Sequence, residues 1–81
     1  METRLSVISI ILHGRESAGQ VNAILSEYGD YIIGRMGLPY REKGMHVMSI
    51  VIDAPGDAIN SLTGKLGRIN DVSVKALFAK T

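Results

Sequence analysis

Apolar and β-branched residues gather in four short runs, and two segments of helical periodicity separate these runs. The runs are too short for stable helices and predict strands at residues 4–13, 31–38, 45–53 and 72–79. Pro39 is expected to stop the second strand because proline cannot donate to a sheet. The polar segment 39–44 (PYREKG) then predicts a turn between two antiparallel strands.

The first helix is predicted to begin at Ser17, because Ser17 and Gln20 have the spacing of a capping box. Its apolar stripe follows the i, i+3, i+4, i+7 pattern at Val21, Ile24, Leu25 and Tyr28. Gly29 stands where a left-handed C-terminal cap is favoured.

The second helix is predicted to have Pro55 in its first turn, where the missing N–H has no intrahelical acceptor. Its apolar positions are Ile59, Leu62 and Leu66, and Gly67 is expected to cap the end. The string Gly64-Lys65-Leu66-Gly67 lacks the spacing of a phosphate-binding loop and belongs to this helix.

The resulting order, β-α-β-β-α-β, predicts an α+β, ferredoxin-like fold of a single domain over residues 1–81. Right-handed crossovers would give one four-stranded antiparallel sheet, ordered four-one-three-two, with both helices on one face. Two helices can cover only one face of this sheet, yet both faces carry apolar residues, at 8, 10, 12, 48, 50 and 52 on one side and at 5, 7, 11, 45, 47 and 51 on the other. The uncovered face, whichever it is, would expose apolar side chains. An exposed patch of this extent predicts a homo-oligomer, a dimer or a tetramer.

Composition supports this expectation and excludes several classes of function. A chain of 81 residues and 8.8 kDa buries only about 60% of its unfolded surface, and the absence of cysteine removes disulfides as a substitute. The formal net charge of +1 gives no basic footprint for nucleic acid, and no apolar run could span a membrane. Glu2 and the absence of a small-x-small cleavage site speak against a signal peptide, so a cytoplasmic protein is expected.

The candidate binding residues are His13, Arg15, Glu16, Gly19, Arg35 and Gly37. His13 ends the first strand beside the 14–19 loop, where it could bind a ligand or simply be solvated. Arg35 lies in a strand between Gly34 and Gly37, which suggests a bulge or a close approach by another backbone or a ligand. Its guanidinium could hold a carboxylate or phosphate, or could merely protect a sheet edge.

No nucleophile stands beside an evident base, so an enzyme is not expected, and the sequence names no cofactor. A metal site would need His13 and His46 from different subunits, and no metal ligands are assigned.

The segment 16–21 (ESAGQV) resembles the effector loop of the ACT regulatory domain, although Glu16 and Ala18 replace that loop's usual Asp and Pro. The strings 34–39 (GRMGLP) and 62–67 (LTGKLG) resemble, together, a family of stand-alone ACT-like domains, the regulators of the iron-only hydrogenase system. That family is similar in fold to the metal-binding domain of the nickel-responsive repressor. The repressor's nickel site does not carry over, because the chain has no cysteine and no His-x-His.

The resemblance implies a regulatory sensor that binds a small effector. The chain has no predicted ribbon-helix-helix or helix-turn-helix segment, so a partner would have to contact any DNA. Two alternatives stay open: a structural or assembly domain that binds a protein partner without a small ligand, and a metal sensor.

Overall fold

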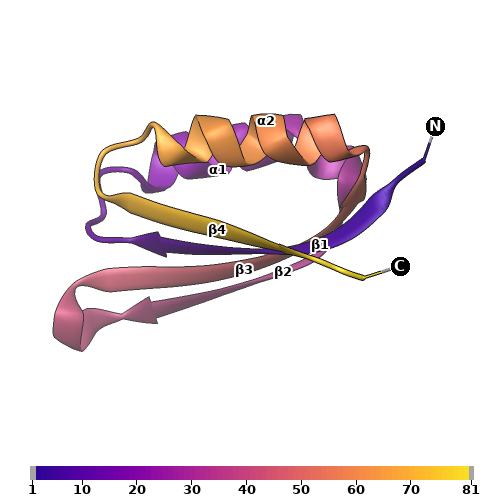
Figure 1. Ribbon diagram of the computed structural model, residues 1–81. Helices are drawn as coiled ribbons and strands as arrows, with labels where there is room; N and C mark the ends of the chain where they lie inside the picture. The colour runs from indigo at the N-terminus through magenta and orange to yellow at the C-terminus, as the bar shows by residue number, and fades with distance from the viewer. Residues whose placement is uncertain (1, 81) are drawn as a thin grey trace.

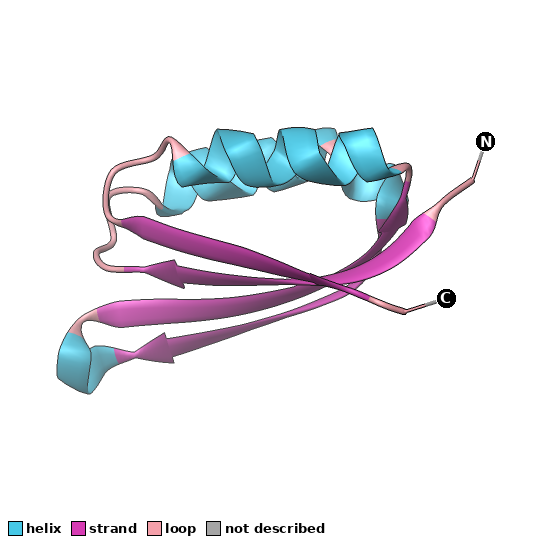
Figure 2. Ribbon diagram, in the orientation of Figure 1, coloured by secondary structure: helices cyan, strands magenta, loops and turns pink. Residues whose placement is uncertain are grey.

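The structure, a computed structural model that describes residues 2–80, has two helices lying side by side on one face of a four-stranded sheet (Figures 1 and 2). The strands are β1 (Arg4–Leu12), β2 (Ile32–Tyr40), β3 (Met45–Ala54) and β4 (Val72–Phe78). The helices are α1 (Ala18–Glu27) and α2 (Gly56–Gly67), and short 3₁₀ turns span Gly29–Tyr31 and Arg41–Lys43. No helix within residues 2–80 is long and apolar enough to cross a membrane.

All strands pair antiparallel in the order β2-β3-β1-β4, so the predicted fold and strand order are confirmed. β1 lies between β3 and β4, with Ile8 opposite both Ile50 and Ala76. β2 and β4 form the two edges.

The core lies between the sheet and the helices. Alternate residues of β1 and β3 point to it because side chains alternate across a strand. Its fully buried members are Ile8, Ile10, Leu12, Val21, Ile50, Ile52, Ala54, Ile59, Leu62 and Leu66, and Leu25 and Met48 are nearly as buried. The predicted helical stripes therefore do face the sheet.

Both helix ends differ from the prediction. Gly29 and Gly67 were expected to adopt left-handed caps, but Gly44 is the only described glycine with a positive φ. The last turns instead tighten into i→i+3 bonds, such as Tyr28 N–H to Leu25 O and Arg68 N–H to Lys65 O. Since these bonds occupy the terminal carbonyls, neither glycine needs a left-handed conformation.

The prediction of a capping box at Ser17 was also wrong. Ser17 is the N-cap residue of α1, but its side chain makes no cap hydrogen bond. Its Oγ donates instead to the backbone carbonyl of Asn70, 3.0 Å away in the α2–β4 connection. A long-range contact has thus replaced the local one.

Two prolines lie at positions in their strand or helix that differ by one or two residues from the predicted ones. Pro39 lies inside β2 rather than after it, which is possible because β2 is an edge strand. Pro55 is the N-cap residue of α2, just before its first turn.

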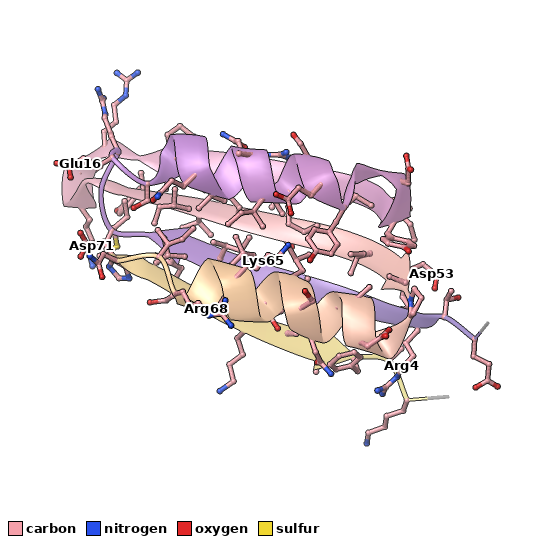
Figure 3. The ribbon with its side chains drawn as sticks, turned by 90° about the horizontal axis from the view of Figure 1, so that it is seen from above. Arg4, Glu16, Asp53, Lys65, Arg68 and Asp71 are labelled. Carbon is pink, nitrogen blue, oxygen red and sulfur yellow. The ribbon has the colours of Figure 1, made fainter. Side chains whose placement is uncertain are left out.

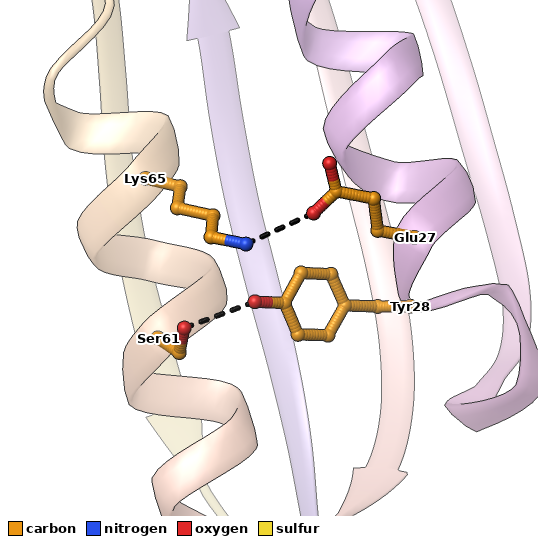
Figure 4. A network of polar contacts seen from close by, with 4 residues as sticks. All are labelled: Glu27, Tyr28, Ser61 and Lys65. Carbon is orange, nitrogen blue, oxygen red and sulfur yellow. Dashed lines mark hydrogen bonds and ion pairs between the residues drawn. The ribbon is translucent and has the colours of Figure 1, made fainter.

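Polar contacts link the outer surfaces of the two helices. Lys65 Nζ of α2 lies 2.9 Å from Glu27 Oε1 of α1, and Tyr28 Oη lies 3.0 Å from Ser61 Oγ (Figure 4). These contacts join the two helices at the solvent side. They complement the apolar contacts beneath.

Candidate functional site

The end of the sheet where β1 stops and the β2–β3 hairpin turns holds a concave pocket of about 280 Å³. The β1–α1 loop supplies one side of it and the hairpin the other, and both lie at the same end of the molecule (Figure 1). Its lining residues are Gly14, Arg15, Pro39, Tyr40, Arg41, Gly44, Met45 and His46. We call it the hairpin pocket.

Two arginines and one histidine, Arg15, Arg41 and His46, are among the residues that line the hairpin pocket. No acidic residue is among the described residues that line it. Arginine presents planar, paired N–H donors that match a carboxylate or a phosphate. Such a pocket can therefore hold a small anion.

The tight turn of the β2–β3 hairpin depends on the backbone conformation of Gly44. Gly44 takes φ +64°, in the left-handed region that glycine adopts without strain, and its N–H donates to Arg41 O. This closes the 3₁₀ turn and starts β3 at Met45. His46 then points to the helix face of the sheet, because it pairs with buried Leu12 in register.

Gly37 determines where the His46 ring lies. A Cβ at position 37 would come within 3.2 Å of His46 Nε2, a contact tighter than side chains normally make. The group close to Gly37 is a side chain, whereas a backbone or a ligand was predicted. The register between β2 and β3 shifts between Ile32 and Gly34, just before the predicted 34–37 segment.

The structure separates the six predicted site residues. Arg15 lines the hairpin pocket, and Gly37 adjoins it through His46. Arg35 lies on the helix side of the sheet, where its Nη2 donates to Asn22 Oδ1 of α1 at 2.8 Å. It stands outside the lining of the pocket.

The remaining three lie elsewhere. His13 Nε2 is 3.0 Å from Ser73 Oγ, at the side of the sheet without helices. Gly19 lies in α1, and a Cβ built there meets nothing within 4 Å. Glu16 lines a second depression, of about 520 Å³, together with Arg68 and Asp71 (Figure 3). That depression carries charges of both signs.

Sequence reasoning missed two lining residues of the hairpin pocket, Arg41 and His46. In the sequence, Arg41 is part of the predicted turn 39–44, and His46 is considered only for a metal site between subunits. The missing signal is tertiary, because only the sheet register brings the hairpin beside Gly14 and Arg15.

The two histidines proposed as a metal pair lie on opposite sides of the sheet. A single chain therefore cannot bring them to one ion. Residues 2–80 contain no cluster of three or more His, Asp or Glu side chains suited to a metal.

Residues 4–76 match the model of the TM1266-like family, whose description is "Iron-only hydrogenase system regulator, putative". Among solved structures, protein TM1266 of Thermotoga maritima is 36% identical with a TM-score of 0.93, over 98% of this chain and 100% of that one. No curated protein shows a detectable match.

More distant structures share the fold alone. The ACT domain of the GTP pyrophosphokinase from Chlorobium tepidum is 21% identical with a TM-score of 0.74, over 95% of this chain and 89% of that one. A formyltetrahydrofolate deformylase from Pseudomonas putida is 11% identical with a TM-score of 0.66, over 90% of this chain and 28% of that one. The fold is thus ACT-like.

Proposed function

The chain belongs to the TM1266-like family of iron-only hydrogenase system regulators, and from that premise we propose that it is a sensor module that binds a small anionic effector in the hairpin pocket. It acts by binding and not by catalysis. The observation that carries the proposal is the convergence of Arg15, Arg41 and His46 on one concave surface.

The charge balance of the pocket favours an anion. Arg15 and Arg41 come from segments far apart in sequence, and the fold brings these two cations to one cleft. Two like charges side by side repel each other, so an unliganded site of this kind costs free energy. An anion between them removes that repulsion and gains charge-assisted hydrogen bonds.

The size and the walls restrict the effector further. About 280 Å³ is at the lower end of the range for small-molecule sites. Pro39, Tyr40 and Met45 add apolar surface beside the cationic groups. The pocket therefore suits a compact molecule with one carboxylate or phosphate and a small apolar part.

Titration with inorganic phosphate, followed by amide NMR shifts, tests the proposal. Saturable shifts are expected at Gly14, Arg15, Gly44 and His46, and they should disappear in the Arg15→Gln/Arg41→Gln double variant. Arg68→Gln is the matched control, because Arg68 lines the other depression. Shifts that persist in the double variant, or that never saturate, would refute an anion site in this pocket.

A further inference from the structure

The side of the sheet that faces away from both helices has no covering element within residues 2–80 (Figure 1). We call it the open face. Its apolar members on the strands are Leu5, Val7, Ile11, Met36, Leu38, Tyr40, Met45, Val47, Val51 and Leu77. Several are strongly exposed, with Leu77 at 72%, Met36 at 64% and Leu38 at 57% of their full surface.

We propose that the open face binds the open face of a second copy of this chain, and that Lys75 of each copy pairs with the partner's Asp53. This proposal goes beyond the effector site: Tyr40 and Met45 belong to both surfaces, but neither Lys75 nor Asp53 lines the hairpin pocket. It specifies the contact for the self-association that the sequence predicts.

The charges of the open face support a second copy as the occupant. Among its strand positions, only Lys75 and Asp53 carry a formal charge, one of each sign. The one ion pair found within residues 2–80 joins Lys65 and Glu27, so neither Lys75 nor Asp53 has an ionic partner among these described residues. A bilayer surface or a nucleic acid would favour an excess of cations, which this face lacks.

The sheet register places these two charges symmetrically about one residue. Lys75 stands opposite Ser9 of β1, and Asp53 stands opposite Leu5. Ser9 and Leu5 are about 13 Å apart along β1, since a strand rises about 3.3 Å per residue. β3 and β4 flank β1 on its two sides, so the midpoint between Lys75 and Asp53 falls at Val7.

A two-fold axis that lies in the plane of the open face, passes Val7 and runs at right angles to the line from Lys75 to Asp53 therefore exchanges the two positions. In an isologous contact, whenever one residue meets a second, that second residue meets the first. Each Lys75 then faces the partner's Asp53, so the pair occurs twice in one dimer, and Val7 meets its own copy at the centre. No charge is left unpaired by this arrangement.

The size of the face suits a stable contact. The molecule measures 41 × 19 × 17 Å, and the sheet occupies its long dimension. Stable interfaces bury roughly 600–1,000 Å² per partner, which a face of this length and width can supply. Covering it would also remove the exposed apolar side chains from water, which is the main driving force for association.

Sedimentation velocity on the whole chain at 10 µM tests the proposal. A dimer is expected, and Lys75→Glu should weaken it by about tenfold or more in Kd, because two acidic groups then meet. Asp53→Lys should do the same. The chain with both changes, Lys75→Glu/Asp53→Lys, should recover association, which only a direct pairing of these two positions explains.

Controls separate an interface effect from misfolding. Lys43→Glu makes the same change of charge in the hairpin turn and should leave association unchanged. Val7→Arg places a charge at the axis and should give a monomer with a wild-type circular dichroism spectrum. A wild-type monomer at 100 µM, an unaffected Lys75→Glu chain, or a double variant without recovery would each overturn the proposal.

The same variants keep the two proposals distinct. Phosphate titration of the Val7→Arg monomer measures the affinity of the hairpin pocket for phosphate in the absence of the dimer. If phosphate binds in the hairpin pocket but the Lys75→Glu/Asp53→Lys chain does not recover association, the effector site is supported and the dimer contact is refuted. An assembly larger than a dimer supports the proposed contact only if Lys75→Glu reduces its size.

Discussion

The imidazole of His46 lies over the α-carbon of Gly37, on the neighbouring strand, so closely that a Cβ there would stand 3.2 Å from Nε2. His46 is only partly buried and also lines the hairpin pocket. Gly37 therefore controls the ring position of a residue that the proposed site uses.

Replacing Gly37 by alanine should move the His46 ring toward the pocket and weaken phosphate binding several-fold. The change in the free energy of unfolding should be small. The contact between the added Cβ and His46 destabilises the folded state, but alanine loses less backbone freedom than glycine on folding. Phosphate titration and thermal unfolding of Gly37→Ala measure both effects.

Gly34→Ala is the matched control, because a Cβ at position 34 meets nothing within 4 Å. It should raise the free energy of unfolding by about 0.5–1 kcal/mol and leave phosphate binding unchanged. Equal phosphate affinity in both variants would show that Gly37 does not position His46.

Ser17→Ala should destabilise the fold by about 1–2 kcal/mol. The change removes the hydrogen bond to Asn70 O and leaves a carbonyl without its donor in a part-buried place. Gln20→Ala should cost almost nothing, since no capping box exists. Urea unfolding distinguishes the two roles, because a capping box would make both changes costly.

Lys65 should stabilise the protein in a pH-dependent way. Its hydrogen bond to Glu27, then its contact with Tyr28, raises the pKa of its ammonium group above 10.5. A raised pKa means that the contribution is complete below the ordinary value and is lost as the pH rises through the raised one.

The difference in melting temperature between wild type and Lys65→Met should therefore be small at pH 8 and should shrink further toward pH 11.5. High salt should reduce it as well, because the pair is exposed. Thr63→Val, on the same helix without an ion pair, is the reference for loss of a polar group. A difference that grows with pH would contradict this assignment.

Ile50→Ala should destabilise the fold by about 2–5 kcal/mol, because Ile50 is fully buried between the sheet and the helices. In a chain this small, such a loss is a large part of the total stability. Ser49→Ala, one residue earlier and on the other face, should change the unfolding free energy far less. Comparable losses would mean that the assigned strand faces are wrong.

The sequence alone determined the element order and the apolar stripes of the helices. The order follows from short β-branched runs that alternate with segments of 3.6-residue periodicity. The sequence did not show which side of each strand faces the helices, because a run such as 45–53 carries apolar residues on both sides. The tertiary structure placed Ile8 and Ile50 in the core, and Val7 and Val51 on the open face.

Tertiary structure alone decided which polar groups meet. Ser17 binds Asn70, Arg35 binds Asn22, and Arg15 shares a pocket with Arg41, although the residues of each pair look unrelated in sequence. Such contacts depend on where loops end once the strands have paired in register, and local periodicity carries no information about that distance. The predicted binding residues were therefore separated, while the predicted fold was confirmed.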